Sequence, residues 1–318
     1  MAQKILITGI TGFAGYYLAK HLLETTNDYI YGTTLTPADK KEIADSEKLH
    51  LVQIDLTDPQ KVSQAVADIR PDVVYHLAAL TSPGESFTAP SETITNNIAS
   101  QVHILEAVRQ AKLTKTKILI ISSAEVYGLV DPKDIPTNEN APLRPASPYA
   151  VSKIAQDFLG LQYHLSHEMH IVRVRPFNHI GPRQAPRFVI ASFAKKIAEI
   201  ERGNQTVLTV GNLSTRRDFT DVRDMVKAYV LAIEKGESGE VYNLGSQVSY
   251  SIEEVLAKLL SYAKKDITVQ VDKELFRKGD IQELLCDVSK FTRLTGWKPT
   301  ISLDQTLKET LDYWRNIV

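Results

Sequence analysis

The feature that most constrains the fold is the stretch KILITGITGFAG (4–15), where an apolar strand pattern runs directly into Gly9, Gly12 and Gly15. Glycines let the backbone turn tightly and approach a ligand closely. The amphipathic segment that follows, 13–26, would present its free N–H groups and the positive end of its dipole to a pyrophosphate. The spacing therefore predicts a strand–turn–helix unit that binds a dinucleotide at the start of a βαβ array.

The first half of the chain repeats this alternation of strands and helices. We expect strands at 4–9, 28–34, 50–56, 72–79, 116–123 and 170–177, and helices near 13–26, 59–69, 94–111 and 148–168. Short continuous apolar strands with helices between them predict a parallel sheet covered on both faces. The predicted fold class is α/β, with a doubly wound parallel sheet of the Rossmann type.

The pattern changes after about residue 177. Loops rich in Pro, Arg and Asn, at 178–187 and 211–219, separate shorter elements, and further helices are expected near 187–202, 222–235, 251–264 and 304–316. We predict a Rossmann domain over 1–176 and a smaller α/β substrate lobe over 177–318. We expect 222–245 to pack back on the main sheet.

Composition narrows the function classes. The 318 residues carry a formal net charge of -1 with no basic block, which argues against nucleic-acid binding. The single cysteine, Cys286, fits a reducing compartment. No apolar run approaches the ~20 residues of a membrane helix, and the MAQKILITG start lacks the features of a signal peptide. We expect a cytoplasmic protein with no membrane partner.

A candidate acid/base pair lies in SPYAVSK (147–153), where Tyr149 and Lys153 are four positions apart. If a helix begins here, both side chains lie on one face. Ser123 follows the fifth predicted strand, at the edge where parallel sheets bind ligands. A phenol with a pKa of about 10 is mostly protonated at neutral pH, and a nearby ammonium favours its ionised form. We therefore expect Lys153 to lower the pKa of Tyr149 for proton transfer.

Ser, Tyr and Lys in this order resemble the triad of the short-chain dehydrogenases/reductases. Four further motifs appear in the order expected for the extended branch of that family: RPFNHIGPRQ (175–184), RRDFTDVRDMVKAY (216–229), GEVYNLGS (239–246) and TGWKP (295–299). Together they are most similar to GDP-4-dehydro-6-deoxy-D-mannose reductases within the epimerase/dehydratase family. The resemblance covers essentially the whole chain.

The resemblance implies a set of site residues. The implied catalytic residues are Ser123, Tyr149, Lys153 and Glu125. The implied cofactor contacts are Gly9, Thr11, Gly12, Phe13, Ala14, Gly15, Thr33, Asp55, Leu56, Leu77, Ala78, Ala79, Asn97, Ser122, Tyr149, Lys153 and Pro176. The implied substrate contacts are Thr81, Glu125, Asn178, Arg183, Val189, Arg217 and Arg277, with Arg216 a weaker candidate.

The cofactor is NAD or NADP, and the sequence leaves the choice open. An NAD enzyme usually has an acidic residue at the end of the second strand for the ribose hydroxyls, and an NADP enzyme a basic one for the 2′-phosphate. Here Thr33, Thr34 and Leu35 occupy that place. Lys40 and Lys41 lie further along the same loop and could supply positive charge.

The implied activity is reduction of the C4 ketone of GDP-4-dehydro-6-deoxy-D-mannose by NAD(P)H, giving a GDP-6-deoxyhexose such as GDP-rhamnose. Related 4,6-dehydratases carry a proton-donating residue where this chain has Ala124, so dehydration is disfavoured although Glu125 is present. The same Ala occurs in UDP-galactose 4-epimerases. A 4-epimerase with tightly bound NAD is therefore the second interpretation, ahead of a dehydratase and a non-catalytic cofactor-binding scaffold.

Two further expectations concern metals and assembly. His164, His167 and His170 drift round a helix and do not match a known zinc motif, so we expect no metal site. The helices near 94–111 and 148–168 carry apolar residues on more than one face, namely Ile104, Leu105, Val108, Phe158, Leu159 and Leu161. In the resembled family such helices pair into a four-helix bundle, which implies a homodimer.

Overall fold

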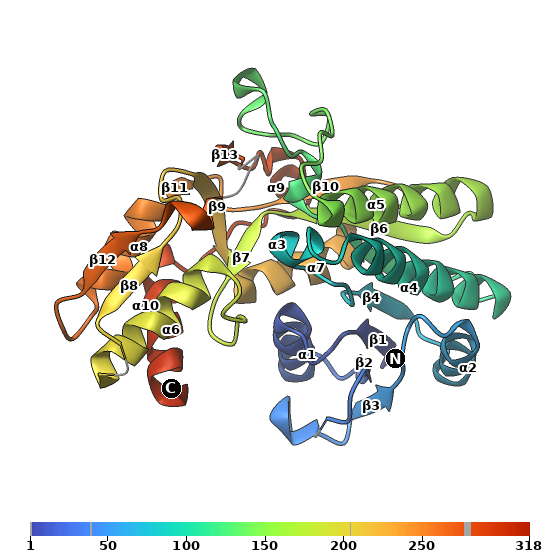
Figure 1. The fold of residues 1–318 in the computed structure, drawn as a ribbon. Coiled ribbons are helices and arrows are strands. Elements are labelled where there is room, and N and C mark those ends of the chain that lie inside the picture. The colour runs from blue at the N-terminus through green and yellow to red at the C-terminus, as the bar shows by residue number, and fades with distance from the viewer. Residues whose placement is uncertain (1, 39, 204, 277–280) are drawn as a thin grey trace.

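The computed structural model describes residues 2–38, 40–203, 205–276 and 281–318, and its main feature is a seven-stranded parallel sheet (Figure 1). In spatial order the strands are β10 (Val241–Leu244), β6 (His170–Pro176), β5 (Lys117–Ile121), β4 (Val73–His76), β1 (Lys4–Thr8), β2 (Tyr29–Thr34) and β3 (Leu49–Gln53). Six of them are the strands predicted from the sequence, and the doubly wound α/β class is confirmed.

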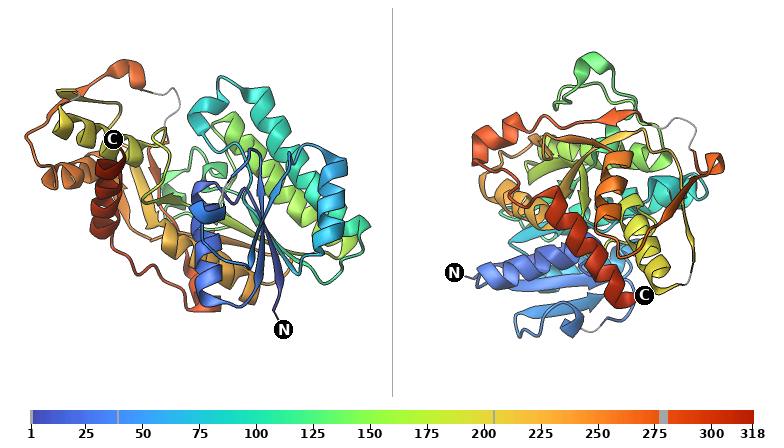
Figure 2. Two further views of the ribbon diagram at one scale, coloured as in Figure 1. Left: turned by 90° about the horizontal axis from the view of Figure 1, so that it is seen from below. Right: turned by 90° about the vertical axis from the view of Figure 1, so that its left-hand side faces the viewer.

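Helices cover both faces of this sheet (Figure 2). On one face lie α1 (Phe13–Thr25), α7 (Val222–Lys235) and α9 (Ser289–Thr295), and on the other α2 (Pro59–Ile69), α4 (Pro90–Gln110) and α5 (Pro148–His167). Alternate strand residues point to opposite faces. In β1, Ile5 and Ile7 accordingly pack with α1 and α7, while Leu6 packs with α2 and α4. We call this sheet with its six helices the main-sheet half.

A local capping signal fixes where helix α2 begins. Asp58 accepts hydrogen bonds from the backbone N–H groups of Gln60 and Lys61, and Pro59 occupies the first helical position of α2. Helix α4 begins at Pro90, earlier than the predicted start near 94. The short helix α3 (Pro83–Ser86) between β4 and α4 was not predicted.

The predicted loops at 178–187 and 211–219 are wrong in part. Each contains a strand, β7 (Asn178–Ile180) and β9 (Arg216–Asp221), and β9 pairs with β7, β11 (Ser249–Ser251) and β13 (Glu283–Leu284). β9 is polar in sequence, but its Asp218 is fully buried and accepts backbone N–H bonds from Ser246 and Gln247. Because the polar side chains of β9 are hydrogen-bonded by residues distant in the sequence, the strand lacks the apolar pattern by which strands are predicted.

The remaining elements form a second core. Helices α6 (Val189–Arg202), α8 (Ile252–Ser261) and α10 (Leu303–Ile317) pack together with β8 (Val207–Val210), which pairs in parallel with β12 (Thr268–Val271). We call these elements, with the sheet around β9, the C-terminal lobe. The lobe lies beside the main-sheet half, and its strands β7 and β9 lie on the side nearest that half (Figure 1). No helix among the described residues is both long and apolar enough to span a bilayer.

Candidate active site

A cavity of about 1130 Å³ lies between the C-terminal ends of the main-sheet strands and the C-terminal lobe. Single-ligand pockets usually measure ~300–1,000 Å³, so this cavity is somewhat larger than a usual pocket for one ligand. Its walls come from both halves of the molecule. The carboxyl ends of parallel strands form the usual ligand crevice of such sheets.

The glycine turn at the start of α1 forms one end of the cavity. The Gly12 N–H donates to the Gly9 carbonyl at 2.9 Å, and Gly9 has a φ of +68°. A Cβ at Gly15 would lie 2.4 Å from the Gly9 carbonyl oxygen, so no larger residue fits there. No side chain caps the first N–H groups of α1. This arrangement fits a pyrophosphate held at a helix N-terminus.

Hydroxyl groups hold the strand ends around this turn. The Thr33 hydroxyl accepts from the Gly9 N–H at 3.1 Å, and the Thr8 hydroxyl accepts from the Ala78 N–H at 3.0 Å. The backbone N–H of Thr57 donates to Asp55 and lowers the pKa of its carboxyl. The predicted cofactor residues that border the cavity are Gly9, Thr11, Gly12, Phe13, Ala14, Gly15, Thr33, Asp55, Leu56, Leu77, Ala78, Ala79, Ser122, Tyr149, Lys153 and Pro176.

Asn97 is the exception among the predicted cofactor contacts, because it does not border the cavity. Its fully buried side chain accepts from the Leu80 N–H at 2.7 Å and donates to the Leu80 carbonyl and the Ser152 hydroxyl. Asn97 therefore ties the loop after β4 to helix α5. It supports the wall of the cavity from behind.

Tyr149 and Lys153 both face the cavity from the first turns of α5. The helix begins where it does because the Ser147 hydroxyl accepts from the Ala150 N–H at 3.1 Å and Pro148 fills the first helical position. The Lys153 ammonium donates to the Ile121 carbonyl at 2.9 Å and lies 6.0 Å from the centre of the Tyr149 ring. The structure thus brings the predicted pair to the end of β5.

Burial dominates the protonation of this pair. Burial raises the pKa of Tyr149 above its ordinary value, and a hydrogen bond with Ser123 acts in the opposite direction. Burial also lowers the pKa of Lys153 to about 7. The predicted lowering of the Tyr149 pKa is therefore not seen in the chain alone, since desolvation penalises both charged forms. The phenol stays protonated at neutral pH.

The turn after β5 supplies the third member of the set. Ser123 is the N-cap of the short helix η2 (Ala124–Val126), and its hydroxyl accepts from the Glu125 N–H at 3.2 Å. The neighbouring Ser122 hydroxyl donates to the Lys153 carbonyl at 3.2 Å, which joins this turn to α5. The negative charge of Glu125 contributes to raising the pKa of Tyr149. Ser123, Glu125 and Tyr149 all border the cavity.

A buried ionic cluster fixes α5 on the sheet one turn beyond Lys153. Asp157 is fully buried and pairs with Arg173 and Arg175 of β6. Arg175 also donates to the hydroxyl of buried Tyr127 at 3.0 Å. Buried charges that are paired and hydrogen-bonded hold their elements in one geometry. The cluster therefore restrains the helix that carries the tyrosine and the lysine.

The predicted substrate contacts that border the cavity are Thr81, Glu125, Asn178, Arg183, Val189 and Arg217. The guanidinium of Arg217 donates to the carbonyls of Arg216 and Ile281, each at 2.8 Å. Arg216 does not border the cavity and pairs instead with Glu254 and Glu283. Arg277 lies outside the described residues.

The sequence interpretation missed the far end of the cavity. This end is lined by Phe193, Lys196, Thr209, Val210, Gly211, Asn212 and Leu275. The Lys196 ammonium donates to the Thr209 carbonyl at 2.9 Å. Val189, Phe193 and Lys196 recur at helical spacing on α6, so a lysine on an otherwise apolar face was a signal in the sequence. The residues from β8 and the 273–275 turn gave no such signal.

The three histidines considered for metal binding are separated by the end of a helix. α5 ends at His167, whereas His170 begins β6. The His164 ring bonds to the Met169 carbonyl and the Ser238 hydroxyl. Across the described ranges, no three or more His, Cys, Asp or Glu side chains gather as a metal site.

The fold and site together define an extended short-chain dehydrogenase/reductase, with its glycine turn, strand-end serine and Tyr–Lys helix around one cavity. The chain belongs to the family described as GDP-mannose 4,6 dehydratase, whose model matches residues 6–310.

Individual relatives cover the whole chain. It is 33% identical to the GDP-6-deoxy-D-mannose reductase of Pseudomonas aeruginosa, over 100% of this chain and 99% of the relative. The structure of RMD from Pseudomonas aeruginosa complexed with NADPH matches with a TM-score of 0.85 and 32% identity, covering 100% of both chains. The UDP-glucose 4-epimerase of Thermus thermophilus in complex with NAD matches with a TM-score of 0.87 and 28% identity, covering 99% of each.

Proposed function

We propose that this protein reduces the C4 ketone of GDP-4-dehydro-6-deoxy-D-mannose with NAD(P)H, giving a GDP-6-deoxyhexose such as GDP-rhamnose. The observation that carries the proposal is the placement of Tyr149, Lys153 and Ser123 on one wall of a cavity that continues into the C-terminal lobe. The similarity to GDP-6-deoxy-D-mannose reductase over the full chain supports the same substrate.

The chain's own groups suit the reductive direction. When bound, the reduced nicotinamide supplies the hydride that adds to C4. Tyr149, kept protonated by burial, donates its proton to the sugar oxygen as the C=O bond becomes a C–O bond. Ser123 lies where its hydroxyl can hold that oxygen beside the phenol. Lys153 is fixed to the strand-end carbonyl of Ile121 and is positioned to return a proton to the phenolate.

The distribution of polar groups supports a GDP-linked sugar. Asn178 and Arg217 border the middle of the cavity and suit a diphosphate. Lys196 borders the far end, on the side of the C-terminal lobe, where the base would lie. An ammonium donates well to the acceptor edge of guanine, O6 and N7. We therefore assign Lys196 to base recognition.

NADPH is our proposed reductant, with NADH as the alternative. β2 ends in Thr33 and Thr34, both buried, where an NAD enzyme usually has a carboxylate for the ribose hydroxyls. NADPH in the related RMD structure supports this choice, while NAD in the epimerase structure keeps the alternative in view.

We further propose a cytoplasmic homodimer. Val151, Phe158 and Leu165 are 45%, 48% and 70% exposed and recur every seven residues on α5, which places them on one face. Exposed apolar stripes of this kind mark protein interfaces. Ile104, Leu105 and Val108 do not contribute, because they are buried inside one subunit. The free, buried thiol of Cys286 suits a reducing compartment.

The test is to present GDP-, UDP-, dTDP- and CDP-linked 4-keto sugars to the purified protein, each with NADH and with NADPH. We expect stoichiometric consumption of NADPH with the GDP-linked ketone and a single C4 configuration by NMR. A 4-epimerase, favoured by the epimerase structures that match the chain, would instead interconvert nucleotide sugars without net consumption of cofactor. Reduction of no 4-keto sugar would contradict the proposal.

A further inference from the structure

Aromatic side chains on the first turns of α1 reach across to β7 and to the loop that follows it. The Phe13 ring lies nearly parallel to the His179 ring, with an interplanar angle of 2° and centroids 5.9 Å apart. One turn along the helix, the Arg183 guanidinium lies 4.0 Å from the centre of the Tyr16 ring. Stacking and cation–π contacts of this geometry are attractive.

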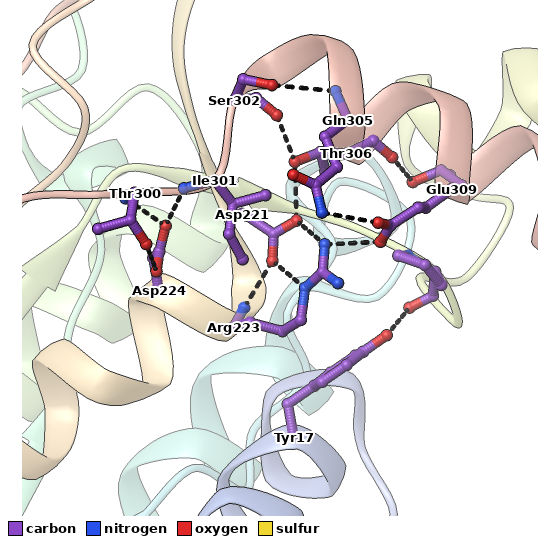
Figure 3. Close-up of polar contacts among 12 residues, drawn as sticks. Tyr17, Asp221, Arg223, Asp224, Thr300, Ile301, Ser302, Gln305, Thr306 and Glu309 are labelled. Atoms are coloured by element: carbon purple, nitrogen blue, oxygen red, sulfur yellow. Dashed lines mark hydrogen bonds and ion pairs between the residues drawn. The ribbon is translucent and has the colours of Figure 1, made fainter.

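A third residue of the same helix adds a hydrogen bond. The Tyr17 hydroxyl donates to the Pro182 carbonyl at 3.0 Å, next to the start of α7 where Asp221 binds Arg223 (Figure 3). Burial raises the pKa of Tyr17, so its hydroxyl remains a donor at neutral pH. We call Phe13, Tyr16 and Tyr17 the aromatic clamp.

The loop that the clamp holds is in a strained conformation. Arg183 has a φ of +71°, in the left-handed region that non-glycine residues seldom adopt. Such strain persists where surrounding contacts determine the backbone. The residue before it, Pro182, accepts the Tyr17 hydrogen bond, and Arg183 itself stacks on Tyr16. The clamp thus holds Arg183 in this conformation at the cavity wall.

The two ends of the clamp belong to two different ligand sites. At one end, Gly12, Phe13 and Ala14 form the helix N-terminus that fits the cofactor pyrophosphate. At the other end, Asn178 and Arg183 border the part of the cavity assigned to the nucleotide sugar. A ligand that orders the first turn of α1 therefore also orders the rings that hold the substrate loop.

We propose that the aromatic clamp couples the two sites, so that bound cofactor tightens the binding of the nucleotide diphosphate. This inference rests on the proposed function for the identity of the second ligand. Cofactor contacts restrain the N-terminal turn of α1 and, through Tyr16 and Tyr17, the loop at 181–184. Because the loop is already ordered, binding of the second ligand costs less conformational entropy. By linkage, the diphosphate tightens cofactor binding by the same factor.

The experiment measures the Kd of GDP by calorimetry with and without saturating NADPH. GDP carries no sugar to touch the nicotinamide and nothing to reduce, and direct repulsion between the two anions can only weaken binding, so any tightening passes through the protein. We expect NADPH to lower the Kd of GDP about fivefold or more in the wild type, the usual scale of such coupling. Tyr17→Phe, which removes only the hydroxyl, should bring this ratio toward one while leaving the Kd of NADPH alone unchanged.

Tyr313→Phe is the matched control, because Tyr313 lies on α10 beside Trp314 and does not border the cavity. In this variant, NADPH should lower the Kd of GDP by the same factor as in the wild type. The inference is overturned if NADPH leaves the Kd of GDP unchanged in the wild type, or if Tyr17→Phe keeps the wild-type ratio. Failure of the proposed function looks different: the wild type would bind UDP but not GDP, and the same ratio would then be measured with UDP.

Discussion

The two walls of the cleft are built in opposite ways. On the main-sheet half, the side chains at the cavity come from short stretches at the ends of strands β1, β4 and β5 and from the helix that begins at Pro148. On the C-terminal lobe they come from α6, β8 and β9, which follow one another in the chain, and from the distant turn around Leu275. The proposed catalytic groups thus lie in short sequence motifs that can be recognised locally. The groups proposed to bind the second ligand come from separate elements and are brought together by the packing of the lobe. Variants in each wall therefore test different parts of the proposed function.

The largest effect is expected on kcat, from a variant in the main-sheet wall. Tyr149→Phe removes the proposed acid, so kcat for the 4-keto sugar should fall about 10²–10⁴-fold. The Kd of NADPH should change little. Steady-state NADPH consumption and a fluorescence titration measure the two quantities. Tyr163→Phe is the control on the same helix, because its hydroxyl donates to Glu106 away from the cavity. Undiminished turnover by the Tyr149 variant would refute the acid role.

The next prediction concerns the proposed dimer interface on α5, which lies on the outer face of the main-sheet half. Phe158→Asp places a charge in the proposed apolar interface, where burying it without a partner is costly. We expect the dimer dissociation constant to rise about 100-fold, equivalent to ~2.7 kcal/mol, as measured by sedimentation velocity. Leu129→Asp alters an exposed apolar residue outside α5 and should leave the dimer intact. A wild-type monomer, or a Phe158 variant that still dimerises, contradicts the interface.

A smaller effect is expected on the lobe wall. Lys196→Met removes the proposed donor to the base, and a hydrogen bond from a charged group contributes ~1.5–3 kcal/mol. The Kd of GDP should rise about 10–100-fold while the Kd of NADPH is unchanged. Lys195→Met is the neighbouring control, since that ammonium pairs with Glu199 and lies over the Trp314 ring. Equal effects of the two variants would remove Lys196 from the base site.

The smallest effect concerns stability and returns to the main-sheet wall. The folded-state pKa of Lys153 is about 7, because burial lowers it, whereas an unfolded lysine titrates near 10.4. Between these values the unfolded chain binds more protons, so the free energy of unfolding rises with pH. Relative to Lys153→Met, the wild-type unfolding midpoint without cofactor should rise about 3 °C from pH 7 to 9. If the unfolding midpoints of the wild type and the Lys153→Met variant change with pH in the same way, burial does not lower the pKa of Lys153.

The contrast between the walls also explains how far the sequence could be interpreted. Gly9, Ser123, Tyr149 and Lys153 border the cavity because each lies at a strand end or in the first turns of a helix, and both positions can be recognised in the sequence. Asn97 was assigned to the cofactor, yet the structure places it behind the wall. Sequence spacing places a residue near a strand end or a helix start. Whether its side chain borders the cavity or lies behind the wall depends on how the loops pack over the strand ends.

The lobe shows the opposite outcome. The strand at Arg216–Asp221 was hidden in a predicted loop, because its charges are paired or hydrogen-bonded by residues distant in sequence. Lys196 was missed although its spacing from Val189 and Phe193 was a signal, because the packing of α6 decides that Lys196 rather than Lys195 borders the cavity. The expected lowering of the Tyr149 pKa was also wrong, since burial raises this pKa and outweighs the hydrogen bond with Ser123.

The sequence by itself determined the parallel sheet, the glycine turn and the order of the Ser, Tyr and Lys residues, because strand and helix periodicity and capping act over a few neighbours. Only the tertiary structure decided which side chains reach the cavity from the C-terminal lobe, how deeply the Tyr–Lys pair is buried and how α1 contacts the substrate loop. Those properties depend on pairings between distant segments and on the desolvation that follows from them, and no local pattern carries that information.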